Sequence, residues 1–309
     1  MIRQGLRALM AGVLGAISGC ASPPPAPAQI TGMPASLANG SVSSYADMDP
    51  AGTPKAIGVM FTAGALENLP AGTDGHHCFT TNSAGRIDPA KDCVVGHERV
   101  LPLPSELARR ADMPFKWALL NWNPVGHIPP GVYDTAHFDV HFVIEPIESI
   151  FAIHAGPCGP EHAGCAEFAT GRKPLPGNYA PASHIDVGAV VPGMGNHLVN
   201  VTGPEFKDEK FKRAWIYGVY DGRVTFYEEM VTRAFMLTKA SECLPIPAPD
   251  AVAVKGYYPT RSCVRFLADK NAYTVSLEDF VMREASAPTA PRQVPPLPPA
   301  PPSGVHSHH

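Results

Sequence analysis

Proline and glycine interrupt this chain so often that it cannot fold into long helices. The 309 residues include 35 prolines and 28 glycines. Proline breaks the hydrogen-bond ladder inside a helix, and glycine weakens a helix through its conformational freedom. Hydrophobic residues still make up 45% of the chain, which is too many for wholesale disorder. The sequence therefore predicts a loop-rich, mainly β globular protein.

Short apolar or alternating segments bounded by turn residues recur along the chain, and we expect each to form a strand. They cover residues 56–62, 116–121, 137–144, 149–154, 187–191, 213–220, 224–227 and 252–258. Asp221-Gly222 predicts a tight hairpin between two of them. Short helices are expected at 104–112 and 277–284. This spacing is typical of an antiparallel β-sandwich or barrel, and a cupin-like fold is one form that it could take.

The first 19 residues have the features of a bacterial lipoprotein signal peptide. Arg3 and Arg7 precede an apolar segment, residues 8–17, that is too short to span a bilayer. Residues 17–20, Ile-Ser-Gly-Cys, resemble a lipobox; an ordinary signal peptide with an incidental cysteine is the alternative. We expect cleavage before Cys20 and lipidation of Cys20. Because Ala21 rather than aspartate follows, we expect an outer-membrane lipoprotein of the cell envelope that faces the periplasm or the exterior.

Composition divides the rest of the chain. We expect a Pro/Ala/Ser-rich linker at residues 20–38, a single β-rich domain at 39–285 and a Pro-rich tail at 286–309. The 24 basic and 28 acidic residues leave a net charge of −4. No basic excess is present to neutralise a phosphate backbone, so nucleic acid is not an expected partner. The expected partner is the membrane, through the N-terminal lipid anchor.

The cysteines indicate disulfides. Six follow Cys20, and an even number in an exported chain is typical of an oxidising compartment. Six cysteines allow 15 connectivities. Their proximity in sequence favours three local pairs: Cys78–Cys93, Cys158–Cys165 and Cys243–Cys263. A cysteine metal cluster is the weaker alternative, because no CxxC spacing occurs.

Residues 137–142, His-Phe-Asp-Val-His-Phe, are the most informative segment for function. In a strand His137, Asp139 and His141 share one face, and imidazole and carboxylate are common ligands of Zn, Fe, Mn and Cu. On a flat strand His137 and His141 would lie roughly 13 Å apart, so a bulge or strong curvature would be needed for both to reach one ion. Two alternatives are a solvent-exposed polar face and core histidines hydrogen-bonded to Asp139. His127, in the turn before this segment, is a further candidate ligand.

This segment resembles a family of secreted bacterial proteins that is described only as a domain of unknown function. Its members carry a glycine-histidine pair followed by an HFD-aromatic-HF signature. The similarity covers roughly residues 39–239. It includes Ile57-Gly58-Val59, Leu101-Pro102-Leu103-Pro104, Asn121-Trp122-Asn123-Pro124, Met194-Gly195-Asn196-His197 and Glu228-Glu229-Met230. The chain departs from the family pattern at Leu198, Asn200 and Glu229.

The resemblance implies a common β-fold with one metal site. It implies His137, His141, His197 and Glu228 as ligands of a divalent metal ion, with Zn²⁺ as the first choice. Asp139 is either a further ligand or a residue that orients an imidazole. No catalytic residue is assigned.

Three hypotheses about function follow. The first is a lipid-anchored envelope protein with a mononuclear His/carboxylate metal site and a binding or sensing role. The second is a cupin-like metal-dependent enzyme of oxygenase or hydrolase type, because the spacing of Gly131 and His137 is similar to the first cupin motif, although Asp139 stands where cupins have a histidine. The third is a structural envelope module without metal.

Overall fold

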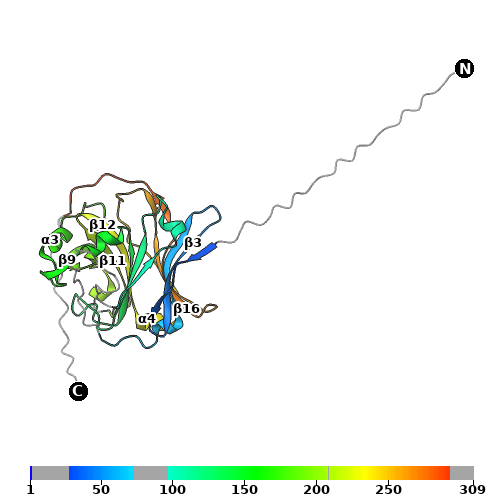
Figure 1. Ribbon diagram of the computed structural model, residues 1–309. Coiled ribbons are helices and arrows are strands. Elements are labelled where there is room, and N and C mark those ends of the chain that lie inside the picture. The colour runs from blue at the N-terminus through cyan, green and yellow to red at the C-terminus, as the bar shows by residue number, and fades with distance from the viewer. Residues whose placement is uncertain (2–27, 73–96, 208, 293–309) are drawn as a thin grey trace.

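Two antiparallel sheets of seven strands form the body of the protein (Figure 1). The computed structural model describes residues 1, 28–72, 97–207 and 209–292. Cys20 and the predicted Cys78–Cys93 pair lie outside these residues. The prediction of a mainly β, antiparallel fold is confirmed. Of the two forms expected, the structure is the sandwich, since neither sheet closes on itself within the described chain.

Neighbouring strands in both sheets are antiparallel. Sheet 1 has the order β1 (Ala28–Thr31), β3 (Gly40–Met48), β4 (Pro54–Thr62), β16 (Ala272–Glu278), β15 (Arg261–Leu267) and β13 (Glu242–Pro245), and β2 (Ala35–Leu37) also pairs with β3. Sheet 2 has the order β5 (Arg99–Pro102), β6 (Trp117–Asn123), β7 (His137–Val143), β12 (Arg223–Thr232), β11 (Arg213–Tyr220), β10 (Gly195–Asn200) and β9 (His184–Val191). The strands β14 (Gly256–Tyr258) and β17 (Val281–Arg283) form a separate pair, and β8 spans Ala155–Cys158.

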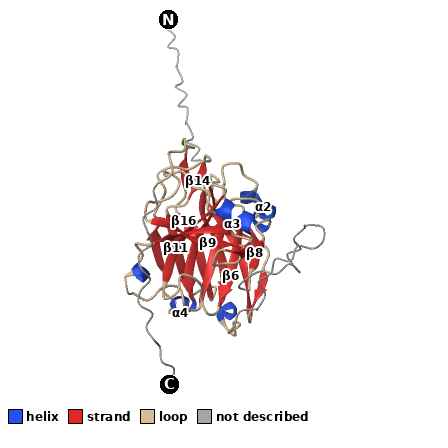
Figure 2. Cartoon of the chain, turned by 90° about the vertical axis from the view of Figure 1, so that its left-hand side faces the viewer, coloured by secondary structure: helices blue, strands red, loops and turns tan. Residues whose placement is uncertain are grey.

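Helices are few and short, as Figure 2 shows. They are α1 (Ser105–Ala108), α2 (Ile147–Phe151), α3 (Cys165–Gly171), α4 (Arg233–Leu237) and the 3₁₀ turns η1 (Ala63–Leu66) and η2 (Pro204–Phe206). No helix of the described chain has the length and apolar character that a membrane span requires.

The main hydrophobic core lies between the two sheets. Phe61 of sheet 1 meets Phe138 of sheet 2 with ring centroids 5.2 Å apart. Val59 and Val275 of sheet 1 and Val140 of sheet 2 belong to the same buried cluster. The apolar face of β7 therefore fills the sandwich, and its polar face points away from sheet 1.

Several local predictions are confirmed. Asp221 and Gly222 both have positive φ, as a two-residue hairpin turn between β11 and β12 requires. Cys158–Cys165 and Cys243–Cys263 are disulfides, which indicates an extracytoplasmic compartment.

Other local predictions are wrong. The first half of the predicted strand 149–154 belongs to α2, because Ile147, Ile150 and Phe151 have helical rather than alternating spacing, and the second half is not a strand. The predicted helix 277–284 is instead the end of β16 followed by β17, because pairing with β15 outweighs its local pattern. Of the predicted strand 252–258, only the last three residues form β14.

The folded part of the chain extends past both predicted ends of the domain. Strands β1 and β2 lie inside the predicted linker 20–38, since the closely spaced prolines end at Pro27, Pro34 lies between the two strands, and both strands pair with β3. At the other end, Tyr179 donates a hydrogen bond to the carbonyl oxygen of Ser286, and Arg292 pairs with Asp250. Both contacts hold the start of the predicted tail.

A buried ion pair in sheet 2 is hydrogen-bonded to sheet 1. Arg213 of β11 donates a 2.6 Å hydrogen bond to Glu229 of β12 and another, of 3.1 Å, to the carbonyl oxygen of Ser262 on β15. The side chains of Arg213 and Glu229 are only 4% and 3% exposed. Removal of Arg213 would therefore leave the buried Glu229 carboxylate without a counter-charge.

We predict that Arg213→Ala lowers the free energy of unfolding by about 3–5 kcal/mol, because Glu229 loses its partner. Arg261→Ala is the control: Arg261 forms a surface pair with Asp279, and such pairs contribute at most about 1 kcal/mol. Urea unfolding of both variants measures the difference. Equal losses in the two would contradict this role for Arg213.

Candidate metal centre

The polar face of β7 is buried beneath a second layer of the protein. His137, Asp139 and His141 are at most 5% exposed, although they lie on the side of sheet 2 that faces away from sheet 1. Two small apolar clusters cover this side. One comprises Trp117, Leu119, Val143, Ile150, Phe151, Ile153, Met194 and Phe226. The other comprises Val132, Tyr133, Val199, Phe211, Ala214, Ile216 and Met230.

His141, His197 and Glu228 come together between these clusters, and we call them the Glu228 triad. The strand register places Glu228 of β12 directly opposite His141. Glu228 Oε2 lies 3.6 Å from Nε2 of His141 and 3.7 Å from Nε2 of His197. One ligand atom from each residue falls within 4.8 Å of the others, so the triad could hold a metal ion.

A glycine in the neighbouring strand β11 leaves room for the aromatic ring that packs against His141 and His197. His197 of β10 pairs with Gly218 of β11. A Cβ at Gly218 would lie 2.1 Å from the ring of Phe226. Without that atom, Phe226 packs against His141 and His197, with centroid distances of 4.9 and 5.0 Å. The glycine thus leaves room for the aromatic ring that supports both imidazoles.

Hydrogen bonds to backbone carbonyls orient both imidazoles. Nδ1 of His141 lies 3.2 Å from the oxygen of Leu119, and Nδ1 of His197 lies 3.1 Å from that of Ala189. A carbonyl only accepts, so Nδ1 carries the hydrogen and Nε2 presents its lone pair to the triad. This is the usual arrangement around a metal-binding histidine.

Two atoms of the Glu228 triad are buried without a hydrogen-bond partner among the described residues. They are Nε2 of His141 and Oε2 of Glu228. Unpartnered buried polar atoms are costly and rare in folded proteins, and an ion is one of the ways in which they are satisfied. The donor set therefore fits a divalent cation.

Burial sets the protonation of the Glu228 triad. It lowers the pKa of His141 to about 4 and that of His197 to about 3. Burial also raises the pKa of Glu228 well above its usual range, and the negative charge of Asp139 adds to the effect. At neutral pH the imidazoles are therefore uncharged, and the raised pKa of Glu228 favours the protonated carboxyl group, whose proton a bound cation would displace.

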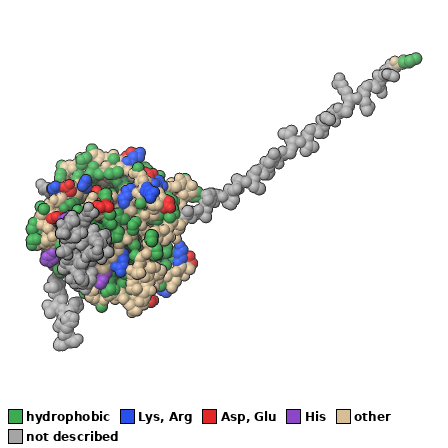
Figure 3. All heavy atoms as spheres, viewed as in Figure 1, with side chains coloured by type: hydrophobic (Ala, Val, Ile, Leu, Met, Phe, Trp, Pro, Cys, Tyr) green, Lys and Arg blue, Asp and Glu red, His purple; other side chains and the backbone are tan. Residues whose placement is uncertain are grey.

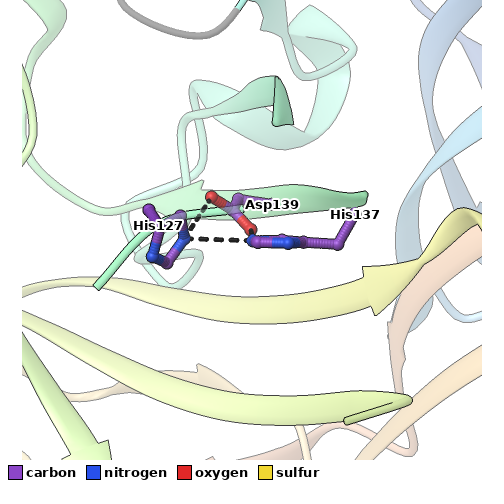
Figure 4. Close-up of side chains that lie close together, drawn as sticks. All are labelled: His127, His137 and Asp139. Atoms are coloured by element: carbon purple, nitrogen blue, oxygen red, sulfur yellow. Dashed lines mark hydrogen bonds and ion pairs between the residues drawn. The ribbon is translucent and has the colours of Figure 1, made fainter. Parts of the chain in front are cut away.

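His127, His137 and Asp139 form a second group, the Asp139 triad (Figure 4). Asp139 Oδ1 lies 3.0 Å from Nε2 of His137, and Oδ2 lies 3.2 Å from Nε2 of His127. Gly126 permits the turn that brings His127 back to β7: its φ is +78°, and a Cβ there would lie 2.0 Å from the oxygen of Tyr133. This group, too, could hold a metal ion.

Charges pair within the Asp139 triad. Burial raises the pKa of Asp139, but His137 and His127 outweigh it and hold the pKa well below the usual range. Burial lowers the pKa of His127, but Asp139 outweighs it and the net shift is upward. The carboxylate is thus ionised beside imidazole, in contrast to Glu228.

The single four-ligand site predicted from the resemblance is divided in the structure. His141, His197 and Glu228 meet, but His137 belongs to the other triad. The reason is the strand spacing: His137 and His141 stay apart along β7. His141 meets Glu228 in its own row of the sheet, whereas His137 meets Asp139, two residues along the same strand, and His127 from the preceding loop. Asp139 and His127, predicted as alternative ligands, are both members of the second triad.

A small cavity of about 70 Å³ touches both triads. Its lining includes His127 and Asp139 of one triad and His197 of the other, together with Asn121, Asn123, Tyr133 and Glu161. This volume has room for about two water molecules. Ligand pockets for metabolites usually measure about 300–1,000 Å³.

Comparison with models of known protein families, with curated proteins and with solved structures finds no match. The family resemblance in the sequence stays a prediction, and the evidence for a metal site is the geometry of the two triads.

We predict that Zn²⁺ binding to the Glu228 triad releases close to one proton at pH 6. Glu228 supplies it, because its pKa is raised, whereas His141 and His197 are already deprotonated. Affinity should rise about tenfold per pH unit until the carboxyl group ionises. Calorimetry in buffers of different ionisation enthalpy measures the proton count. Release of two or more protons would contradict this assignment.

Proposed function

We propose that this protein is a lipid-anchored cell-envelope protein that binds one divalent first-row metal ion through the Glu228 triad, in a binding or sensing role. The observation that carries the proposal is the pair of unpartnered buried atoms, His141 Nε2 and Glu228 Oε2, which face one another beside His197. Cys20, in its lipobox-like context, would carry the anchor.

The ion that best suits this donor set is Zn²⁺. Two neutral imidazoles and one carboxylate match the ligands that it takes in proteins, at bond lengths of about 2.0–2.2 Å. At about 2.1 Å, tetrahedral ligand atoms lie roughly 3.4 Å apart. The separations of 3.6 and 3.7 Å in the triad are within a few tenths of an ångström of that value.

Charge distribution agrees with a partner other than nucleic acid. The net charge is −4, and basic and acidic side chains are interspersed on the face that Figure 3 shows. That face presents no extended basic surface for a phosphate backbone.

The size of the cavity favours binding over catalysis on a metabolite. The cavity of about 70 Å³ beside the triad is well below the usual size of a metabolite pocket, about 300–1,000 Å³. A metal-dependent enzyme acting on a very small molecule is the second candidate. It is favoured by the three-ligand sets, since catalytic zinc sites keep a fourth position open.

Removal of the triad histidines tests the proposal. We predict that the full chain binds Zn²⁺, and that His141→Ala and His197→Ala each weaken binding at the Glu228 triad at least about 100-fold, because each removes a ligand. His184→Ala is the matched control: His184 is also buried, but its two ring nitrogens contact Ser183 Oγ and the oxygen of Trp215, outside both triads.

Equilibrium dialysis with Zn²⁺ and elemental analysis provide the measurement. Loss of affinity in the two triad variants but not in His184→Ala supports the proposal. Absence of Zn²⁺ binding in the unaltered chain, or equal affinity in all four proteins, would contradict it and favour a structural envelope module.

A further inference from the structure

The Asp139 triad has the geometry of a metal site in its own right. Its ligand atoms are Nε2 of His127, Nε2 of His137 and the carboxylate of Asp139, whose Oδ1 lies nearer His137 and whose Oδ2 lies nearer His127. The two nitrogens lie 3.0 Å apart, and the nearest carboxylate oxygens lie 3.0 and 3.2 Å from them. Figure 4 shows the two rings and the carboxylate converging on one point.

Both imidazoles of this triad are held by Nδ1. Nδ1 of His127 lies 2.8 Å from the oxygen of Ile128, and Nδ1 of His137 lies 2.6 Å from that of Thr135. Each Nδ1 donates its hydrogen to a carbonyl, so the two Nε2 atoms and the carboxylate oxygens face one another. Electron pairs at these separations repel unless a proton or a cation lies between them.

The 3.0 Å separation of the two Nε2 atoms matches the edge of an octahedron, and each has a carboxylate oxygen of Asp139 at 3.0 or 3.2 Å. At a bond length of about 2.1 Å, neighbouring ligands of a six-coordinate ion lie about 3.0 Å apart. Two histidines and one carboxylate on one face of such an ion leave the remaining positions open, as in non-haem iron sites. Asn123 donates a 2.6 Å hydrogen bond to Oδ2 of Asp139 and fixes the carboxylate in place.

The two triads lie next to each other on β7. Asp139 and His141 are two residues apart on the same face, which corresponds to about 6–7 Å along a strand. Members of both triads line the same cavity. His127 is the most accessible member, with 32% of its side chain exposed, so an ion can enter from its side.

We propose that the Asp139 triad binds a second metal ion, of a kind that favours six-coordination, such as Mn²⁺, Fe²⁺ or Co²⁺. This goes beyond the single ion of the proposed function. The protein then carries two neighbouring sites, each made of two histidines and one carboxylate. One cavity supplies the open positions of both.

Stoichiometry tests the second site with Co²⁺ as the probe. The full chain is freed of metal with a chelator and dialysed against Co²⁺, and bound cobalt is counted by elemental analysis. We expect two ions per chain in the unaltered protein and in His184→Ala. We expect one in His127→Ala, one in Glu228→Gln and none when both changes are combined. His127 is in a loop, so its replacement leaves the strands unaltered, and thermal unfolding of each variant verifies the fold.

The outcomes separate the two proposals. One ion that persists in His127→Ala and is lost in Glu228→Gln overturns the second site and leaves the proposed function standing. One ion that is lost in His127→Ala and persists in Glu228→Gln supports the Asp139 site and overturns the proposed function. If no ion binds, both fail, and the Asp139 triad is a hydrogen-bonded His–Asp–His ladder.

Discussion

The alternation of side chains along β7 is the constraint on which the rest of the structure depends. Phe138, Val140 and Phe142 fill the core between the sheets, so the intervening His137, Asp139 and His141 must point to the opposite face. In an ordinary sandwich that face would meet water. Here apolar side chains from the loops and from α2 cover it, and the polar groups of β7 are enclosed.

Enclosure gives the two triads different electrostatic characters. Burial keeps His141 and His197 uncharged and raises the pKa of Glu228, so the Glu228 triad favours neutral groups, and two of its atoms are unpartnered. In the Asp139 triad the carboxylate and the imidazoles compensate one another. In the Glu228 triad a divalent cation would displace the proton of the carboxyl group. In the Asp139 triad it would take the place of the proton that imidazole and carboxylate share. Both triads are fixed by hydrogen bonds from Nδ1 to the backbone, which reduces the reorganisation that metal binding requires.

Sequence reasoning could predict what depends on local spacing. The period of two in β7, the hairpin at Asp221-Gly222 and the pairing of Cys158 with Cys165 are local, and each agrees with the structure. The partners of each histidine depend on cross-strand register and on the return of a loop, which the residues alone do not reveal. Only the family resemblance suggested His197 and Glu228. It did not separate His137 from His141, because that separation follows from the row of the sheet in which each residue lies.

The central claim is that a metal ion lies among His141, His197 and Glu228. Crystals of the protein grown with Zn²⁺ test it most directly, through anomalous diffraction on either side of the zinc absorption edge. We predict a peak about 2.0–2.2 Å from Nε2 of both histidines and from an oxygen of Glu228. Density without an anomalous peak at that point, with zinc bound only to surface residues, would contradict it.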